Sequence, residues 1–261
     1  MATRRIALAT AMAGVLLAGT LTVDAGAQSQ NIPFDHYLCY KATKAKVTPP
    51  PVTLIDEFDE AEGTRENVQP EKATKFCAPV IEKNHEKVLF DPVIHLTRYP
   101  FKAKAPAKTV EVTNQFEHVV LTTGVPDELM VPTTKGLTET PAPPTGEEYS
   151  YEHYKCYTLK ETAFTKSDVL VTDQFGAHTL NLTKRTRLCN PTTKIVNGRT
   201  FPIRNPERHL LCYAVKPTTK EKLPTVFTNN QFGADQLKLG SAVELCLPTL
   251  KKLLSKPNKT T

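Results

Sequence analysis

The fold is decided by the stretch HYLCY at residues 36–40, because its pattern returns three more times along the chain. The later copies are HLTRY at 95–99, HYKCY at 153–157 and HLLCY at 209–213, spaced 59, 58 and 56 residues apart. Self-similarity at a fixed period is typical of repeat architectures. The sequence therefore predicts four repeats of about 57 residues, numbered here one to four.

Two further blocks follow each copy, always in the same order. The second block ends in Phe and reads VTLIDEF at 52–58, VEVTNQF at 110–116, VLVTDQF at 169–175 and VFTNNQF at 226–232. The third block ends in Pro and reads FCAP at 76–79, LMVP at 129–132, LCNP at 188–191 and LCLP at 245–248. Repeat one alone carries an insertion of five residues, in the acidic stretch 59–70. Three blocks in one order, four times over, establish the repeat.

The repeat also predicts how the cysteines pair. Six cysteines allow fifteen connectivities. Repeats one, three and four each have one cysteine in the first block and one in the third, whereas repeat two has Arg98 and Met130 at those places. A disulfide within each repeat explains this joint loss, since a single orphan thiol would be reactive. The predicted pairs are Cys39–Cys77, Cys156–Cys189 and Cys212–Cys246. Pairing between neighbouring repeats is the alternative, and no C-x2-C spacing indicates zinc.

The N-terminus predicts export. Arg4 and Arg5 precede an apolar stretch at 6–23, and the small residues at 25–27 form a cleavage pattern, so residues 1–27 are interpreted as a signal peptide. An uncleaved membrane anchor is the alternative. After cleavage we expect no membrane span and a secreted or periplasmic localisation, where cysteines form disulfides.

Inside each repeat the apolar residues alternate with a period of two, which indicates strands. Gly176 and Gly233 directly follow the second block and can adopt positive φ in a turn. Each unit is therefore expected to hold about four short antiparallel strands, and the fold class is all-β. The one expected departure is a short helix or tail at 250–254.

A change in composition suggests a domain boundary. Residues 138–148 are rich in Pro and small polar side chains and are interpreted as a linker. Because one repeat is too short for a good core, the repeats are expected to pair into two β-sandwich or barrel-like domains. These would be 28–137, with repeats one and two, and 149–261, with repeats three and four and a C-terminal tail. The alternative is a four-bladed β-propeller with one repeat per blade.

The three blocks resemble a family of exported bacterial repeat proteins marked by H-x-x-C-Y, D-Q-F-G and L-C-x-P, which is classed as a domain of unknown function. The resemblance covers nearly the whole chain after the signal. It departs in repeat one, where DEFD stands at 56–59, and in repeat two, which lacks both cysteines and has Glu117 for Gly. The resemblance implies export, disulfides and repeated β-units, and it brings no catalytic residues.

Two sets of repeated polar residues are candidate metal or pH-sensitive groups. They are the first-block histidines His36, His95, His153 and His209, and the acid–amide pairs at 56–57, 114–115, 173–174 and 230–231. A residue that recurs in every unit favours a structural role, because a site needs different residues to converge. We therefore expect hydrogen-bonded histidines, turn-capping Asp or Asn side chains, and phenylalanines that anchor the core. The unrepeated His85, His118 and His178 are expected to be exposed.

The net charge of +6 on 261 residues is too diffuse to indicate nucleic acid. Lysines do recur in the loop after each first block, and they would form a cationic rim if the loops share one edge. The rim residues are Lys44, Lys46, Lys102, Lys104, Lys108, Lys220 and Lys222. Solvated loops that protect strand edges are the favoured interpretation, and the alternative is a rim whose partner would be an extracellular polymer or an envelope surface.

Motifs for serine hydrolases, P-loops, zincins and dithiol redox sites are absent from the sequence. No cofactor or metal is expected. The sequence favours a non-catalytic binding or structural role at the cell envelope or outside the cell. The alternative is a secreted hydrolase that acts through a carboxylate pair, a device that leaves little trace in sequence.

Overall fold

The computed structural model describes residues 34–145, 151–219 and 222–254, so the predicted signal at 1–27 and Lys220 lie outside the described residues. Within these ranges the chain is nearly all strand, which confirms the all-β class.

Repeat one contains β1 (Tyr37–Thr43), β2 (Val52–Asp56), α1 (Glu57–Glu62), β3 (Glu66–Val68) and β4 (Lys75–Lys83), followed by β5 (Glu86–Lys87). Repeat two contains β6 (His95–Pro100), β7 (Thr109–Thr113) and β8 (His118–Gly136). Repeat three contains β9 (His153–Leu159), β10 (Ala163–Asp173), β11 (Gly176–Val196) and β12 (Arg199–Phe201), and repeat four contains β13 (His209–Pro217), β14 (Thr225–Asn230) and β15 (Gly233–Leu253).

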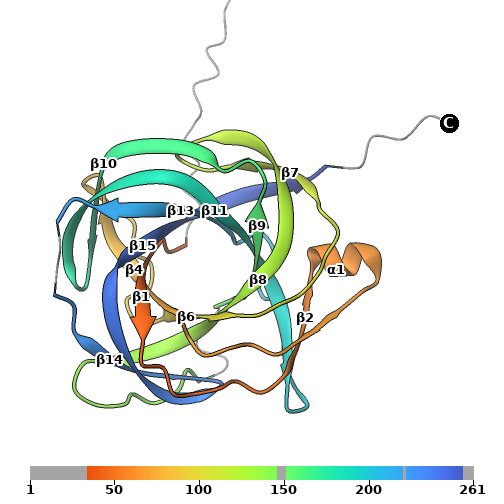
Figure 1. Cartoon of the computed structure of the whole chain (residues 1–261), viewed down its shortest axis with the longest axis horizontal. Coiled ribbons are helices and arrows are strands. Elements are labelled where there is room, and N and C mark those ends of the chain that lie inside the picture. The colour runs from red at the N-terminus through yellow and green to blue at the C-terminus, as the bar shows by residue number, and fades with distance from the viewer. Residues whose placement is uncertain (1–33, 146–150, 220–221, 255–261) are drawn as a thin grey trace, which may run out of the picture.

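Eight of these strands close into a ring. The first-block strand of each repeat pairs with the third-block strand of the same repeat and of the preceding one. The resulting antiparallel order is β1, β4, β6, β8, β9, β11, β13, β15 and back to β1. Figure 1 looks into this ring, with α1 on its outside. The last pairing joins Tyr37 to Cys246, so the two ends of the repeat array are hydrogen-bonded neighbours.

The remaining strands wrap the outside of the ring. In repeats two, three and four the third and fourth expected strands are one long strand, whose first half pairs with the second-block strand and whose second half enters the ring. Gly176 and Gly233 begin two of these strands with φ of 136° and 113°, as predicted for the turn. In repeat one the insertion interrupts this path and forms α1 and β3 instead.

The outer strands cross to the opposite repeat. The outer strands β2 and β10 pair with the ends of β11 and β4, which links repeats one and three in both directions. Repeats two and four are linked in the same way, because β7 pairs with the end of β15 and β14 with the end of β8.

The first-block tyrosine of each repeat fixes this crossing. In two cases the tyrosine hydroxyl donates to a carboxylate of the opposite repeat: Tyr40 to Asp173 at 2.6 Å and Tyr157 to Asp56 at 2.9 Å. In the other two, Asn230 and Asn114 donate to Tyr99 and Tyr213, both at 2.8 Å.

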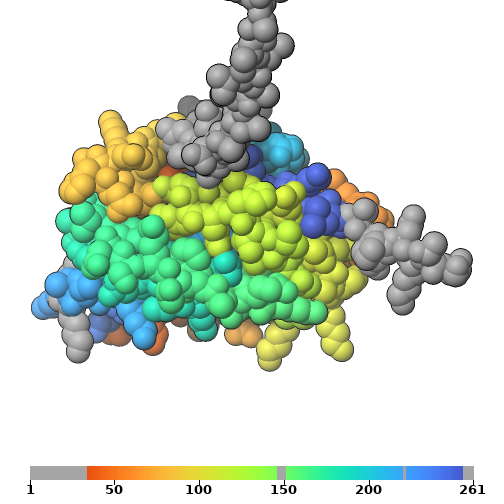
Figure 2. All heavy atoms as spheres, turned by 90° about the horizontal axis from the view of Figure 1, so that it is seen from above, coloured from red at the N-terminus to blue at the C-terminus, as the bar shows by residue number. Residues whose placement is uncertain are grey.

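The strand pairing crosses the boundary between the expected domains 28–137 and 149–261. Strands β8 and β9 of repeats two and three are paired, and both outer crossings also span the expected boundary. In Figure 2 the yellow-green segments of repeat two and the green segments of repeat three lie side by side. The described part of the expected linker is held in place, since Thr134 and Asn229 donate to the carbonyls of Ala142 and Pro141. A propeller is also excluded by this pairing, because its blades are separate sheets.

The prediction for the C-terminal segment was also wrong. Residues 250–253, expected as a helix or tail, extend β15 and pair with Val110–Thr113 of β7. The backbone groups of that outer strand would lack partners on this edge without them.

Two apolar cores result from the alternation of side chains along each ring strand. The outer core fills the space between the ring and the wrapping strands. The inner core lies inside the ring and consists mainly of the six cysteines together with Met130, Leu96, Leu210, Tyr37 and Tyr154. The cysteines form the three predicted disulfides, each joining directly opposed residues of neighbouring strands. No free cysteine remains.

Replacing one disulfide tests its contribution. The double variant Cys156→Ala/Cys189→Ala opens a loop whose ends are 33 residues apart in sequence. We expect the free energy of unfolding to fall by about 3–4 kcal/mol, because the unfolded chain gains freedom, as measured by urea unfolding. Peptide mapping without reductant should give the three intra-repeat pairs, and a Cys77–Cys156 peptide would contradict the pairing.

Candidate functional site

The ring encloses a group of charged side chains next to the disulfides. Each third-block strand places one charged residue two positions before its cysteine or methionine, so that it also points inward. Around the ring these residues are Lys75, Glu128, Arg187 and Glu244, and their charges alternate in sign. Lys75 contacts Glu128 at 2.8 Å and Glu244 at 3.0 Å, and Arg187 contacts the same two carboxylates at 3.2 and 2.9 Å.

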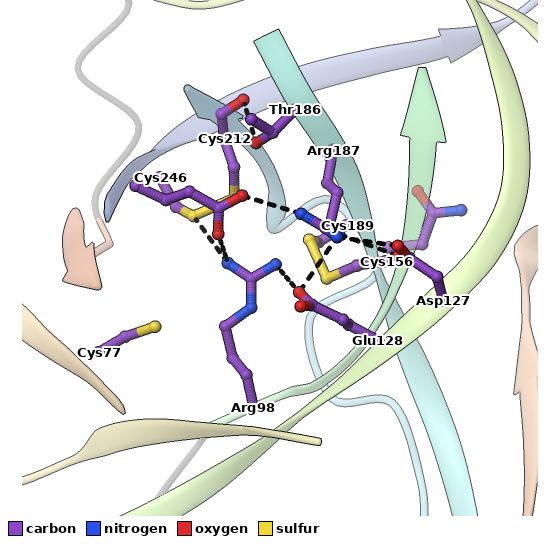
Figure 3. The surroundings of a disulfide bond; sticks show 12 residues. Cys77, Arg98, Asp127, Glu128, Cys156, Thr186, Arg187, Cys189, Cys212 and Cys246 are labelled. Atoms are coloured by element: carbon purple, nitrogen blue, oxygen red, sulfur yellow. Dashed lines mark hydrogen bonds and ion pairs between the residues drawn. A yellow bond between two sulfur atoms is a disulfide. The ribbon is translucent and has the colours of Figure 1, made fainter. Parts of the chain in front are cut away.

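Arg98 occupies the place of the missing fourth disulfide. It lies directly opposite Met130 in the β6–β8 pairing and is completely buried. Its guanidinium binds Glu128 and lies 2.5 Å from Glu244, and it also lies 3.9 Å from the sulfur of Cys246 (Figure 3). In repeat two, where both cysteines are absent, the buried guanidinium of Arg98 thus links the carboxylates of Glu128 and Glu244.

The interior charges stabilise one another. Burial alone would raise the pKa of Glu244, but Arg98, Lys75 and Arg187 together lower it to about 2. The pKa of Glu128 is lowered by the same three cations against its own burial. The Arg98 side chain is fully buried, and those of Glu128 and Glu244 are almost fully buried. This cluster of charges is therefore a structural element inside the ring.

The depressed pKa of Glu244 predicts how stability depends on pH. Since the unfolded carboxyl titrates near 4.5 and the folded one near 2, its stabilisation is present above pH 4.5 and is lost as the pH falls to about 2. The Glu244→Gln variant should lose on the order of 3 kcal/mol at pH 7 and show a flatter acid limb in urea titrations. The exposed Glu139→Gln is the control. An unchanged acid limb in Glu244→Gln would contradict the assignment.

The repeated histidines take structural roles. Gln115 and Gln174 donate to the Nε2 atoms of His36 and His95 at 2.5 and 2.6 Å, and His153 donates to Gln231 at 2.7 Å. In every case the partner belongs to the next repeat, and Glu57 of repeat one lies 3.9 Å from His209 of repeat four. Burial lowers the pKa of His36 to about 3 and of His95 to about 4, so both rings are neutral in ordinary conditions.

The second block is structural too. Its Asp or Asn accepts the backbone amide of the Phe two residues later, for example at 2.8 Å from Phe175 to Asp173, as predicted. Each Phe also makes an edge contact with the first-block tyrosine of the opposite repeat. His178 was expected to be exposed, but it is buried, and its ring lies 3.0 Å from the Tyr40 hydroxyl. It comes two residues after Gly176 at the turn, which places it beside the contact between Tyr40 and Phe175.

A fourth repeated residue, overlooked in the sequence, completes each junction between repeats. It is the lysine that follows the third block: Lys83, Lys135, Lys194 and Lys251. Each ammonium contacts the Gln or Glu of the next repeat and lies 4.3–5.5 Å from the centre of that repeat's second-block phenylalanine ring. The lysines follow the third-block cysteine or methionine by five or six residues. This near-constant spacing is the sequence signal that could have identified them as a further repeated position after the proline.

Lys194 gives the clearest consequence of this burial. Its ammonium contacts the neutral amide of Gln231, and burial lowers its pKa to about 7. Because the unfolded lysine titrates near 10.5, the unfolded chain binds more protons between these values, so stability rises from pH 7 to pH 10.5. Lys194→Met should remove this rise and be at least as stable at pH 7, in urea titrations. The assignment would be contradicted if Lys194→Met kept the wild-type rise in stability with pH. It would also be contradicted if the exposed Lys87→Met lost that rise to the same extent.

The ring places the lysine-bearing loops at one end. The four first-block strands run in the same direction, since each neighbour in the ring is antiparallel to the next. The loops that follow them therefore share an end, and the yellow loop after β6 and the light-blue loop after β13 project from the same lower face in Figure 2. Exposed lysines of these loops are Lys44, Lys46, Lys102, Lys104 and Lys222. Lys108 is half-buried and pairs with Glu62.

The insertion of repeat one forms an unrepeated acidic site. Helix α1 begins at a capping box in which Asp56 and Asp59 bond each other's backbone amides. A cavity of about 250 Å³ beside it is lined in part by Asp59 and Glu66. Lys155 is fully buried and lies 2.7 Å from Asp59 and 3.0 Å from Glu66. Burial raises the pKa of both carboxyls, and Lys155 opposes that rise.

Comparison with known proteins gives one match. A family model described as a repeat of unknown function (DUF7450) matches residues 95–248. No curated protein and no solved structure matches the chain. Across the described ranges, no helix is long and apolar enough to cross a membrane, and no group of three or more His, Cys, Asp or Glu side chains is placed to hold a metal ion.

Proposed function

The chain belongs to the DUF7450 family of repeats, and on that premise we propose that it is a secreted or periplasmic, non-catalytic module that binds an anionic extracellular polymer. The binding surface is the cationic rim, made of the lysine-bearing loops after β1, β6 and β13. The observation that carries the proposal is the common direction of the first-block strands, because it gathers these loops at one end of the ring.

The composition of the ring supports export and binding at its surface. All six cysteines are paired, which suits an oxidising compartment. The inside of the ring is filled by disulfides and ion pairs, so a polymer can reach only the ends or the outer surface.

The rim has the chemistry for a polyanion. Flexible lysines spread over several loops act as point charges that suit a polymer with a varied anion spacing. Several such charges at one end raise the local concentration of an anionic partner and make its binding sensitive to salt.

The alternative of a hydrolase with a carboxylate pair is less well supported. Its best location is the cavity beside α1, where Asp59 and Glu66 both bind Lys155. A general acid has to exchange protons with its substrate, whereas both carboxyls here already contact the buried ammonium of Lys155.

Heparin and polyphosphate are suitable probes of the rim. The variant Lys44→Gln/Lys102→Gln/Lys222→Gln removes one exposed charge from each of three loops. We expect elution from heparin at lower salt and affinity for both polymers weaker by about tenfold or more at low ionic strength.

A charge-matched control separates the rim from net charge. Lys87→Gln/Arg199→Gln/Arg204→Gln removes three exposed cations away from the rim loops and should bind nearly as the wild type. Equal loss in the two triple variants, or elution of the wild type with a neutral protein of the same size, would overturn the proposal.

A further inference from the structure

The end of the ring opposite the rim holds a cavity of about 280 Å³, here called the cup. Its floor includes Tyr37, Leu96 and Tyr154, whose side chains point into the ring. Tyr37 and Tyr154 each stand two residues before a disulfide-bonded cysteine on the same strand. The layer of disulfides therefore lies directly beneath the floor and separates the cup from the interior charges.

The floor carries two hydroxyl groups that are open to the cup. Tyr37 and Tyr154 hold equivalent positions in repeats one and three, where repeats two and four have leucines. They are 3% and 4% exposed; neither hydroxyl is bonded to another described residue, and neither is among the fully enclosed polar atoms that lack a partner, so both reach the space of the cup. Buried tyrosine hydroxyls normally have a hydrogen-bond partner. Since both side chains line the cup, a polar group of a ligand can supply it.

The walls of the cup are negatively charged. They include the carboxylates of Asp35, Asp91 and Glu152 against one guanidinium, that of Arg208. Asp35 accepts the backbone amide of Phe90 at 2.7 Å, and Glu152 that of Asn205 at 2.6 Å, so both carboxylates are fixed in place. Burial, and to a smaller extent the charge of Asp91, raises the pKa of Asp35 to about 6, against the backbone hydrogen bonds from Phe90 and Asp91 and the charge of Arg208. Three carboxylates and one guanidinium are thus the charged groups among the lining residues of the cup.

Aromatic rings complete the walls. Phe34, Phe90 and Tyr151 line the cup, and Arg208 already lies 5.6 Å from the centre of the Phe34 ring. Ring faces attract cations, and more strongly where water is excluded. Hydroxyl oxygens accept hydrogen bonds from N–H groups, and the carboxylates add attraction for a positive charge.

We propose that the cup binds a small organic ligand through a primary ammonium group, which donates to the hydroxyls of Tyr37 and Tyr154 in the negative field of Asp35, Asp91 and Glu152. A neutral polyol would satisfy the hydroxyls but leave the excess negative charge unbalanced. This site is separate from the cationic rim, and the cup and the rim attract ligands of opposite charge.

Calorimetric titration of the disulfide-bonded protein with cadaverine tests the cup, with pentanediol as the neutral analogue of equal chain length. We expect cadaverine to bind and pentanediol not to bind. The variant Tyr37→Phe/Tyr154→Phe keeps both rings and should weaken cadaverine binding about tenfold or more, because a hydrogen bond to a charged group is lost at each position. Asp91→Asn, which removes one charge, should weaken it as well.

Two controls make the outcome specific. Tyr99→Phe/Tyr213→Phe removes two outward-facing hydroxyls, those of the last first-block residue in repeats two and four, and should leave cadaverine binding unchanged, as should Lys44→Gln/Lys102→Gln/Lys222→Gln at the rim. Thermal unfolding checks that each variant is folded. Absence of cadaverine binding at millimolar concentration, equal binding of pentanediol, or full affinity in Tyr37→Phe/Tyr154→Phe would overturn the proposal, whatever the rim variants do with heparin.

Discussion

The backbone hydrogen bonds between β1 and β15 are the constraint on which the rest of the structure depends. They join the first repeat to the last, so every third-block strand has a neighbour on both sides and no edge is left in the ring. Closure also directs one face of all eight strands inward, where the three disulfides pack with Met130, Leu96, Leu210, Tyr37 and Tyr154. The outer strands then find partners across the ring, and the tyrosine contacts with Asp or Asn hold them there.

Residues that recur in all four repeats hold the fold, and departures from the repeat create the distinctive sites. The histidine, glutamine, lysine and phenylalanine of each junction link one repeat to the next, with Glu57 replacing glutamine at the junction between repeats four and one. Arg98 departs from the cysteine pattern and binds the interior carboxylates. Tyr37 and Tyr154 depart from the leucines of repeats two and four, and their hydroxyls give the cup its polar floor. Of the two proposed ligand sites, the cup therefore depends on a departure from the repeat, whereas the rim uses lysines that recur.

Features set by local or repeated residues could be predicted from the sequence. Joint loss at Arg98 and Met130 revealed the disulfide pairing, and the position of Gly176 after Phe175 revealed the turn. Ring closure could not be predicted, because Tyr37 and Cys246 carry no local signal of their contact. Helix α1 was missed although its capping box, from Asp56 to Asp59, is visible in the sequence. Lys194 was missed because its buried role depends on Gln231 and Phe232 of the following repeat, which only the folded ring brings near.

Repeats one and three, and repeats two and four, pair their strands across the ring, which interlocks all four repeats. Scanning calorimetry of the disulfide-bonded chain measures this most directly. We expect a single transition whose calorimetric and van't Hoff enthalpies agree, because neither half of the ring keeps its strand partners when the other half unfolds. Two separate transitions, each with about half of the total enthalpy, would contradict it.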